Sequence, residues 1–288
     1  MAIPMIRAIQ SLPDTTVDIL VGCMPDDFGA HQVLSKVVSG QGKLYTTVAL
    51  EHPYDVAVMA IPFDGRWHNG IHFNAKTVLD GRTRPDPSTT GLISWKKHEV
   101  LYQMENAHEL GYSGQPPSMN FLGDSKVDRE KIYLGVGYKK DAAGFWKVKH
   151  WGNENYATLI KLLLDSNPSL HVIATGDAAD LQLSIAPISR MVSDRRFEFK
   201  LSSRSNLDEA FRTVAGCGIY VGNDTGMMHV AAAAGLDVCG LFFMKNAYVK
   251  NRPWMRWGKF DISLDTTWMQ VTPEIVAAKI KDRLSCTS

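Results

Sequence analysis

Cysteine is scarce in this chain of 288 residues: there are four, they lie far apart, and none forms a Cys-x-x-Cys pair. This spacing excludes a zinc knuckle, a redox dithiol and a dense disulfide framework, and it favours a reducing cytoplasm as the location. Long apolar runs are also missing, since the longest, residues 231–243, is interrupted by Asp237 and falls short of the ~20 residues of a membrane-spanning helix. The opening residues break at Pro4, too early for a secretory signal. We therefore expect neither a membrane span nor a cleaved leader.

An excess of charge of one sign is absent as well. Lys and Arg number 31 against 30 Asp and Glu, so no global field favours nucleic acid or an anionic membrane. Low-complexity bias is absent too, because hydrophobic residues make up 45% of the chain and charged residues 21%. We expect a soluble, packed protein of one large or two modest domains, in which any polyanionic ligand is bound by a local site.

What the chain does contain is a recurring pattern: a short apolar strand, a Gly- or Asp-bearing turn, and an amphipathic helix. This pattern is typical of parallel sheets with crossover helices, so the predicted class is α/β. The predicted strands are residues 17–21, 56–60, 132–136, 171–175, 218–221 and 238–242. Apolar residues at i, i+3, i+4 and i+7 predict helices over residues 156–163 and 207–214. Thr272 and Pro273 predict the cap and first turn of a last helix.

A segment rich in Gly, Pro, Ser and charge, from about Gly111 to Glu130, marks a domain boundary. We place the boundary near residue 120, so that residues 1–120 form a shorter first domain and residues 121–288 a full α/β domain. Residues 64–90 lack clear periodicity, which predicts a long loop region. They contain His68 and His72, but two histidines without a third ligand are poor evidence for a metal, and no metal site is predicted.

The most informative segment is a strand that turns through residues 223–226 into a helix of good helix formers. A helix that begins at the carboxyl edge of a sheet offers backbone N–H groups and a positive dipole end, which suit a nucleoside diphosphate. Gly226 allows a ligand to approach closely. The structural alternative is that Asp224 or Thr225 caps the helix and His229 packs in the core. The spacing by itself leaves both interpretations open.

Motifs in several parts of the chain match one known family. Residues 223–238 (Asn-Asp-Thr-Gly-Met-Met-His-Val-Ala-Ala-Ala-Ala-Gly-Leu-Asp-Val) closely resemble a D-T-G-x-x-H-x-A-A-A-x-G-x-P signature. Residues 149–151 (Lys-His-Trp) are similar to a K-H-W-P segment, residues 271–276 to a last helix, and residues 4–9 and 17–20 to a first helix and second strand. All of these belong to glycosyltransferase family 9, the lipopolysaccharide heptosyltransferases, and the resemblance extends over most of the chain.

This resemblance implies a GT-B fold, in which two Rossmann-like domains face each other across a cleft. It implies metal-independent, inverting transfer of a heptose or related sugar from a nucleotide-diphosphate donor to a saccharide or lipid-linked acceptor. The donor, with ADP-heptose as the candidate, would bind the C-terminal domain, and no further cofactor is expected. The resemblance also implies a cytoplasmic enzyme, with peripheral attachment to the inner membrane as a further option. No nucleic-acid partner is expected, and the sequence does not indicate an oligomeric state.

The resemblance also implies donor-site residues, carried over by motif position. Lys149 would carry the charge of the diphosphate in place of a metal ion, and His229 would brace the loop. The residues expected to touch the donor's phosphates or sugar are Asp224, Thr225, Gly226 and Met227. Asp177, just beyond a strand end, is a further candidate for the nucleoside. The alternatives are a solvated lysine at 149 and an ordinary strand-to-helix turn at 177.

The chain departs from the family pattern at its start. Family members open with a strand and a Gly-Asp turn that supplies the general base, whereas only two residues separate Met1 from the matching Pro4. We therefore expect either a longer natural chain or a shortened, catalytically impaired remnant that binds nucleotide-sugars. Weak substitutes for the base follow the first strand, where a solvated turn is the alternative: Asp26, Asp27 and His31.

Two further interpretations remain. An unrelated Rossmann-like dinucleotide-binding protein is one alternative, although no Gly-x-Gly-x-x-Gly follows a predicted strand. The other concerns basic and aromatic residues after the last predicted strand. We expect them to pack in an interdomain crossover, and the alternative is that they frame an anionic partner or the rim of the cleft. These residues are Lys245, Lys250, Arg252, Trp254, Arg256, Trp257 and Lys259.

Overall fold

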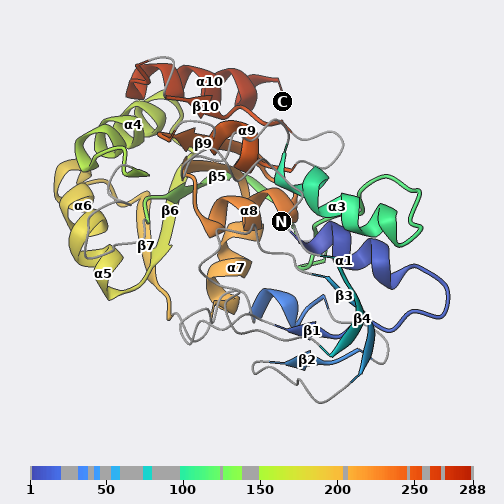
Figure 1. The fold of residues 1–288 in the computed structure, drawn as a ribbon. Helices are drawn as coiled ribbons and strands as arrows, with labels where there is room; N and C mark the ends of the chain where they lie inside the picture. The colour runs from blue at the N-terminus through green and yellow to red at the C-terminus, as the bar shows by residue number, and fades with distance from the viewer. Residues whose placement is uncertain are drawn as a thin grey trace. The chain divides into compact units, whose positions relative to one another are not determined.

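The structure is a computed structural model in which the chain divides into two compact units, Met1–Met119 and Asn120–Ser288 (Figure 1). The point of division follows the Gly- and Pro-rich residues 114–118. Both units are α/β, with parallel strand pairing throughout the described residues. The structure describes residues 2–20, 32–37, 42–45, 53–58, 74–79, 98–123, 126–137, 149–203, 207–244, 247–254, 260–266 and 270–286.

The first unit combines a helix pair with two short parallel ladders. Its elements are α1 (Ile3–Gln10), β1 (Ile19–Leu20), β2 (Leu44–Tyr45), β3 (Tyr54–Val58), β4 (Ala75–Leu79) and α3 (Glu99–Glu109). β1 pairs with β2, and β3 pairs with β4. Pro4 occupies the first turn of α1, where its missing N–H costs no helical hydrogen bond. The apolar faces of α1 and α3 pack together, and Asn106 Nδ2 lies 3.5 Å from Met5 Sδ.

Strand β4 lies inside residues 64–90, for which the sequence predicts a long loop, and the prediction is wrong at this strand. Ala75 and Leu79 are half-buried while the three residues between them are exposed, so no alternation of apolar and polar residues marks the strand. The strand forms because its backbone makes hydrogen bonds to the partner strand β3. Its own sequence pattern does not reveal this pairing. His68 and His72 lie outside the described residues.

The second unit is built on a six-stranded parallel sheet in the order β10-β9-β8-β5-β6-β7. Its elements are β5 (Asp128–Gly135), α4 (Asn153–Ser166), β6 (His171–Gly176), α5 (Ala178–Asp180), the π-helical turn η3 (Leu181–Ile185), α6 (Ala186–Val192), β7 (Phe197–Leu201), α7 (Asp208–Ala215), β8 (Cys217–Asn223), α8 (Gly226–Ala234), β9 (Asp237–Phe242), α9 (Ala247–Asn251), β10 (Leu264–Asp265) and α10 (Pro273–Ser285). The chain runs outward from β5 through β6 to β7 and then returns to the other side of β5 for β8, β9 and β10. The strand order therefore reverses between β5 and β8, which is where open α/β sheets bind ligands.

Helices cover both faces of this sheet. α4 packs against α6 and α10, and α7 packs against α8 (Figure 1). Right-handed crossovers that leave the reversal point in opposite directions place α4 and α8 on opposite faces. Side chains of β5 alternate accordingly: Ile132 and Leu134 join the apolar cluster that includes Leu159 of α4, whereas Tyr133 stacks on Tyr220 with ring centroids 5.8 Å apart.

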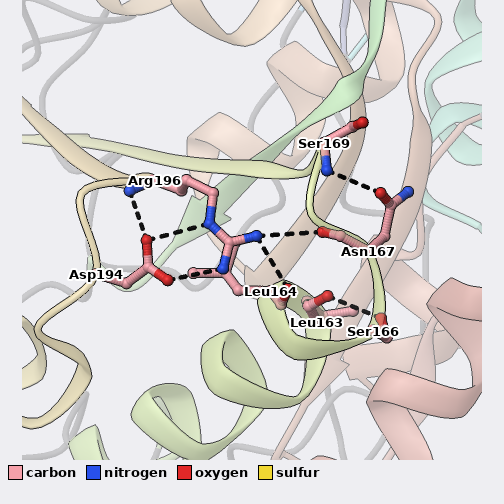
Figure 2. Close-up of polar contacts among 7 residues, drawn as sticks. All are labelled: Leu163, Leu164, Ser166, Asn167, Ser169, Asp194 and Arg196. Atoms are coloured by element: carbon pink, nitrogen blue, oxygen red, sulfur yellow. Dashed lines mark hydrogen bonds and ion pairs between the residues drawn. The ribbon is translucent and has the colours of Figure 1, made fainter.

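The carboxyl end of α4 is held by Arg196, at the edge of the sheet where the strands begin (Figure 2). Its Nη2 donates to Asp194 at 2.8 Å, and its Nη1 donates to the carbonyl oxygens of Leu164 at 3.0 Å and Asn167 at 3.3 Å. Terminal helix carbonyls lack an intrahelical donor, and a cation also suits the negative end of the helix dipole. Arg196 thus ties the turn before β6 to the segment that leads into β7.

Candidate functional site

Asn223, the last residue of β8, joins the two sides of the point where the strand order reverses. Its side chain is fully buried, and its Nδ2 donates to the carbonyl oxygens of Val136 and Gly137, each at 3.3 Å. Its Oδ1 accepts from the Tyr156 hydroxyl at 2.7 Å. Val136 and Gly137 directly follow β5, so this one amide holds the exits of β5 and β8 together. A buried amide whose donors and acceptor are all used fixes local geometry strongly.

Two glycines allow the strand exits to approach this closely. Gly222 has φ +154°, and a β carbon there would overlap the carbonyl oxygen of Gly135. A β carbon at Gly135 would in turn overlap the Tyr220 hydroxyl, which donates to the Asn223 carbonyl at 2.8 Å. Burial raises the pKa of both Tyr220 and Tyr156 above the usual range, so both hydroxyls keep the protons that they donate in this network.

Directly beyond β8, helix α8 begins at Gly226 with Thr225 as its N-cap residue. The Thr225 side chain makes no capping hydrogen bond, whereas Thr272 Oγ1 accepts from Ile275 N at the start of α10. Gly226 is exposed, and apart from its chain neighbours and the backbone of its own helix, no described atom lies within 4 Å of the position that a β carbon would take there. The first turn of α8 therefore presents N–H groups and the positive dipole end at an open position, which suits an anion.

Lys149 and Asp224 form an ion pair beside this helix start, although 75 residues separate them in the chain. Lys149 Nζ lies 2.9 Å from Asp224 Oδ2 and also donates to the Asp224 carbonyl oxygen at 3.4 Å. The side chains are 18% and 6% exposed, so little water screens their attraction. Lys149 is therefore not the solvated lysine of the structural alternative, and Asp224 uses its carboxylate on Lys149 rather than as a helix cap.

Asn251, the last residue of α9, also reaches Asp224. Its Nδ2 donates to Asp224 Oδ2 at 3.3 Å. No sequence motif marks this residue, because an asparagine in a short helix matches none, and only its proximity to Asp224 in space reveals it. It lies among the basic and aromatic residues after β9, of which Arg252 is exposed and Trp254 half-buried. The side chains of the other members lie outside the described residues: Lys245, Lys250, Arg256, Trp257 and Lys259.

Met227, His229 and Asp177, also predicted as site residues, lie within the described ranges. Met227 and His229 lie on α8 and are both half-buried. Asp177 follows β6 at the same edge of the sheet, and its Oδ1 accepts from Ala179 N at 2.8 Å and Asp180 N at 3.0 Å. This carboxylate caps α5 in a reciprocal arrangement with Asp180, which is the structural alternative for that position. The candidate substitutes for the base lie outside the described residues: Asp26, Asp27 and His31.

The described ranges hold neither a cluster of metal ligands nor a membrane-spanning helix. No group of three or more His, Cys, Asp or Glu side chains within those ranges is arranged to hold a metal ion. Of the helices in the same ranges, none combines the length and the apolar character that crossing a bilayer requires.

Comparison with known proteins gives a family match and partial relatives. Residues 97–256 match the profile of glycosyltransferase family 9 (heptosyltransferase). The chain is 31% identical over 101 residues to lipopolysaccharide heptosyltransferase 2 of Escherichia coli (strain K12), covering 35% of this chain and 28% of the relative. It is 28% identical over 122 residues to lipooligosaccharide heptosyltransferase 2 of Haemophilus influenzae, covering 41% and 34% respectively. The matched part thus spans about a third of the length of these curated relatives.

Solved structures share the fold over nearly the whole chain. E. coli heptosyltransferase WaaC with ADP superposes with a TM-score of 0.69 at 17% identity, covering 98% of this chain and 94% of that one. E. coli ADP-heptose lps heptosyltransferase II gives 0.62 at 17% identity, covering 99% and 94%. This likeness confirms the predicted α/β fold of GT-B type with Rossmann-like domains. Because the family profile covers more than half of its residues, the chain belongs to glycosyltransferase family 9.

Proposed function

We propose that this chain transfers a sugar from a nucleoside-diphosphate donor, and that the donor's diphosphate binds at the N-terminus of α8 beside Lys149. The observation that carries the proposal is the Lys149–Asp224 pair at the uncapped start of α8, where the strand order of the sheet reverses. Membership of glycosyltransferase family 9 supports a transferase. Two of the structures with the same fold are described as holding ADP and ADP-2-deoxy-2-fluoro heptose. We therefore propose ADP-heptose as the donor.

The acceptor we propose is a saccharide or lipid-linked saccharide, as in lipopolysaccharide assembly, because the relatives are named lipopolysaccharide and lipooligosaccharide heptosyltransferases. In an inverting transfer, the acceptor hydroxyl attacks the anomeric carbon from the face opposite the diphosphate. The new bond to the acceptor oxygen forms as the bond to the phosphate oxygen breaks, and the hydroxyl proton passes to a general base. Negative charge then grows on the departing diphosphate, and the enzyme must stabilise it.

The start of α8 supplies that stabilisation from fixed groups. Backbone N–H groups around Thr225, Gly226 and Met227 donate toward an anion, and the helix dipole adds to their effect. The ammonium of Lys149 stands beside them, held by Asp224. Groups that are already oriented before the reaction cost no reorganisation when charge develops, which is the most effective form of electrostatic catalysis.

Asp224 has a different role in this proposal. A carboxylate repels phosphate oxygens, so it does not itself bind the diphosphate. It orients the Lys149 ammonium, and it is suited to accept hydrogen bonds from hydroxyl groups of the donor sugar, which are neutral donors. In the turn between β8 and α8, the carboxylate proposed to bind the sugar, that of Asp224, thus directly precedes the N–H groups proposed to bind the phosphate, which begin at Thr225.

Calorimetric titration with ADP, UDP, GDP, ADP-heptose and NADH tests the proposal, followed by mass spectrometry of an acceptor saccharide incubated with ADP-heptose. We expect ADP and ADP-heptose to bind in preference to the other nucleotides, and sugar to be transferred. Lys149→Ala should abolish most of the binding, while Lys161→Ala, on the exposed side of α4, should leave it unchanged. Binding without transfer would indicate a nucleotide-sugar-binding remnant, and preference for NADH would overturn the proposal.

A further inference from the structure

Asp224 Oδ2 receives hydrogen bonds from two side chains that come from different segments. Lys149 Nζ donates at 2.9 Å from the segment before α4, and Asn251 Nδ2 donates at 3.3 Å from the end of α9. Two donors on one carboxylate oxygen restrict its orientation more than one donor does. The Asp224 side chain is only 6% exposed, so water cannot readily replace a donor that is lost.

The two donors respond differently to an anionic ligand. A diphosphate at the start of α8 attracts the Lys149 ammonium and so competes with Asp224 for it. The amide of Asn251 is neutral and has no comparable attraction to the diphosphate, so its bond to Asp224 persists when the ammonium is shared. Without that bond, the carboxylate would be repelled by the incoming phosphate while losing part of its hold on the ammonium.

Asn251 is held in position because its helix, α9, packs against the sheet. It ends α9, and Tyr248 in the same helix packs edge-on against Phe242, the last residue of β9, with ring centroids 5.4 Å apart. The Arg252 backbone N–H continues the helical hydrogen bonding to the Tyr248 carbonyl at 3.1 Å. α9 is therefore anchored to the carboxyl end of the sheet, next to the turn that carries Asp224.

We propose that Asn251 is a positioning residue of the donor site, which holds the Asp224 carboxylate in place when Lys149 engages the diphosphate. The inference rests on the proposed function and adds to it a residue that acts through the Asp224 carboxylate rather than on the diphosphate itself. It also assigns a specific role to α9, a segment that lies outside the short sequence motifs at residues 149–151, 223–238 and 271–276.

Two substitutions test the proposal through the dissociation constant of ADP, measured by calorimetry, and through the KM for ADP-heptose. Asn251→Ala removes the donor, and we expect ADP to bind about five- to tenfold more weakly, the usual net effect of losing one hydrogen bond. Asn251→Asp has the same shape but places a second carboxylate against Asp224 and competes for Lys149. We expect it to weaken binding at least about tenfold further. If Asn251 only filled space, Asn251→Ala would weaken ADP binding more than Asn251→Asp, because Asp preserves the shape of Asn.

Asn167→Asp is the matched control, since it makes the same change of charge at the opposite edge of the sheet and keeps the acceptor used by Ser169 N at 2.9 Å. We expect this variant to bind ADP as the original chain does. The inference is overturned if the original chain binds ADP and both Asn251 variants bind it equally well, or if Asp is milder than Ala. Unfolding of both variants in a thermal scan would also overturn it, by assigning Asn251 a structural role. Failure of the original chain to bind any nucleotide would overturn the proposed function first, and this inference with it.

Discussion

Removing Lys149 alone from the Lys149–Asp224 pair should cost more stability than removing both charges. Lys149→Met keeps the apolar stem and deletes the ammonium, which leaves a carboxylate that is 6% exposed beside the Asn251 amide. Stranding one charge of a buried pair costs about 3–5 kcal/mol. Lys149 is 18% exposed and the Asn251 hydrogen bond remains, so we expect a smaller loss of about 2 kcal/mol in the free energy of unfolding. For a domain of this size that lowers Tm by about 4–8 °C.

The reciprocal change should be milder. Asp224→Asn removes the carboxylate at nearly constant shape, and the more exposed Lys149 can recover water, so we expect a loss of about 1 kcal/mol. The double variant Lys149→Met/Asp224→Asn contains no stranded charge and should lie within about 1 kcal/mol of the original chain. Together, these expected losses correspond to a coupling energy of about 2 kcal/mol between Lys149 and Asp224 in a double-mutant cycle.

Urea unfolding followed by circular dichroism gives the four stabilities, and calorimetry with ADP gives the four affinities. We expect stability to return in the double variant while ADP binding does not, because the ammonium that attracts the diphosphate is still missing. Stabilities that add to within about 0.5 kcal/mol would refute the electrostatic coupling. ADP binding at the original affinity in the double variant would refute the role of Lys149 at the phosphate.

Three further predictions concern the framework of the site. Tyr156→Phe leaves Asn223 Oδ1 buried without its 2.7 Å donor and should lower the free energy of unfolding by about 1–3 kcal/mol in urea titrations, with loss of ADP affinity. Gly222→Ala forces a side chain onto φ +154° and against the Gly135 carbonyl, so we expect a loss of at least about 3 kcal/mol or no folded protein on size exclusion. Burial raises the pKa of the Cys239 thiol to about 12. Because the unfolded thiol ionises with a pKa of about 8.5, stability from this group is complete below that pH and falls as the pH rises toward 12, by about 2 kcal/mol at pH 10. Urea titrations at pH 8 and 10 should show this loss in the original chain and a smaller one in Cys239→Ala.

Local sequence patterns predicted many elements of the second unit because hydrophobic periodicity and capping act over a few residues. The Thr272 cap and Pro273 start of α10 are confirmed, with Thr272 Oγ1 accepting from Ile275 N. The predicted helix over residues 156–163 lies within α4. β7 was not predicted, since the edge strand Phe197–Leu201 is half-buried or exposed throughout and lacks an apolar run. β8 is longer than predicted, because Gly222 and Asn223 continue it.

The site was only partly accessible from sequence. Lys149 and the residues around Asp224 were predicted from the family motifs, which record which residues occur but not which of them touch. The Lys149–Asp224 ion pair, the Tyr156–Asn223 hydrogen bond and the contribution of Asn251 all join distant segments. No local pattern encodes such contacts.

The sequence by itself determined the alternation of strands and helices and the start of a helix just after the turn at residues 223–226, because each depends on neighbouring residues alone. Only the tertiary structure decided that β5 lies between β6 and β8. That order depends on how whole elements pack against one another, and the close approach of β8 to β5 requires Gly222 and Gly135 to lie face to face. The same packing brings Lys149 and Asn251 to a single oxygen of Asp224, so the chemistry of the site follows from the strand order rather than from any one segment.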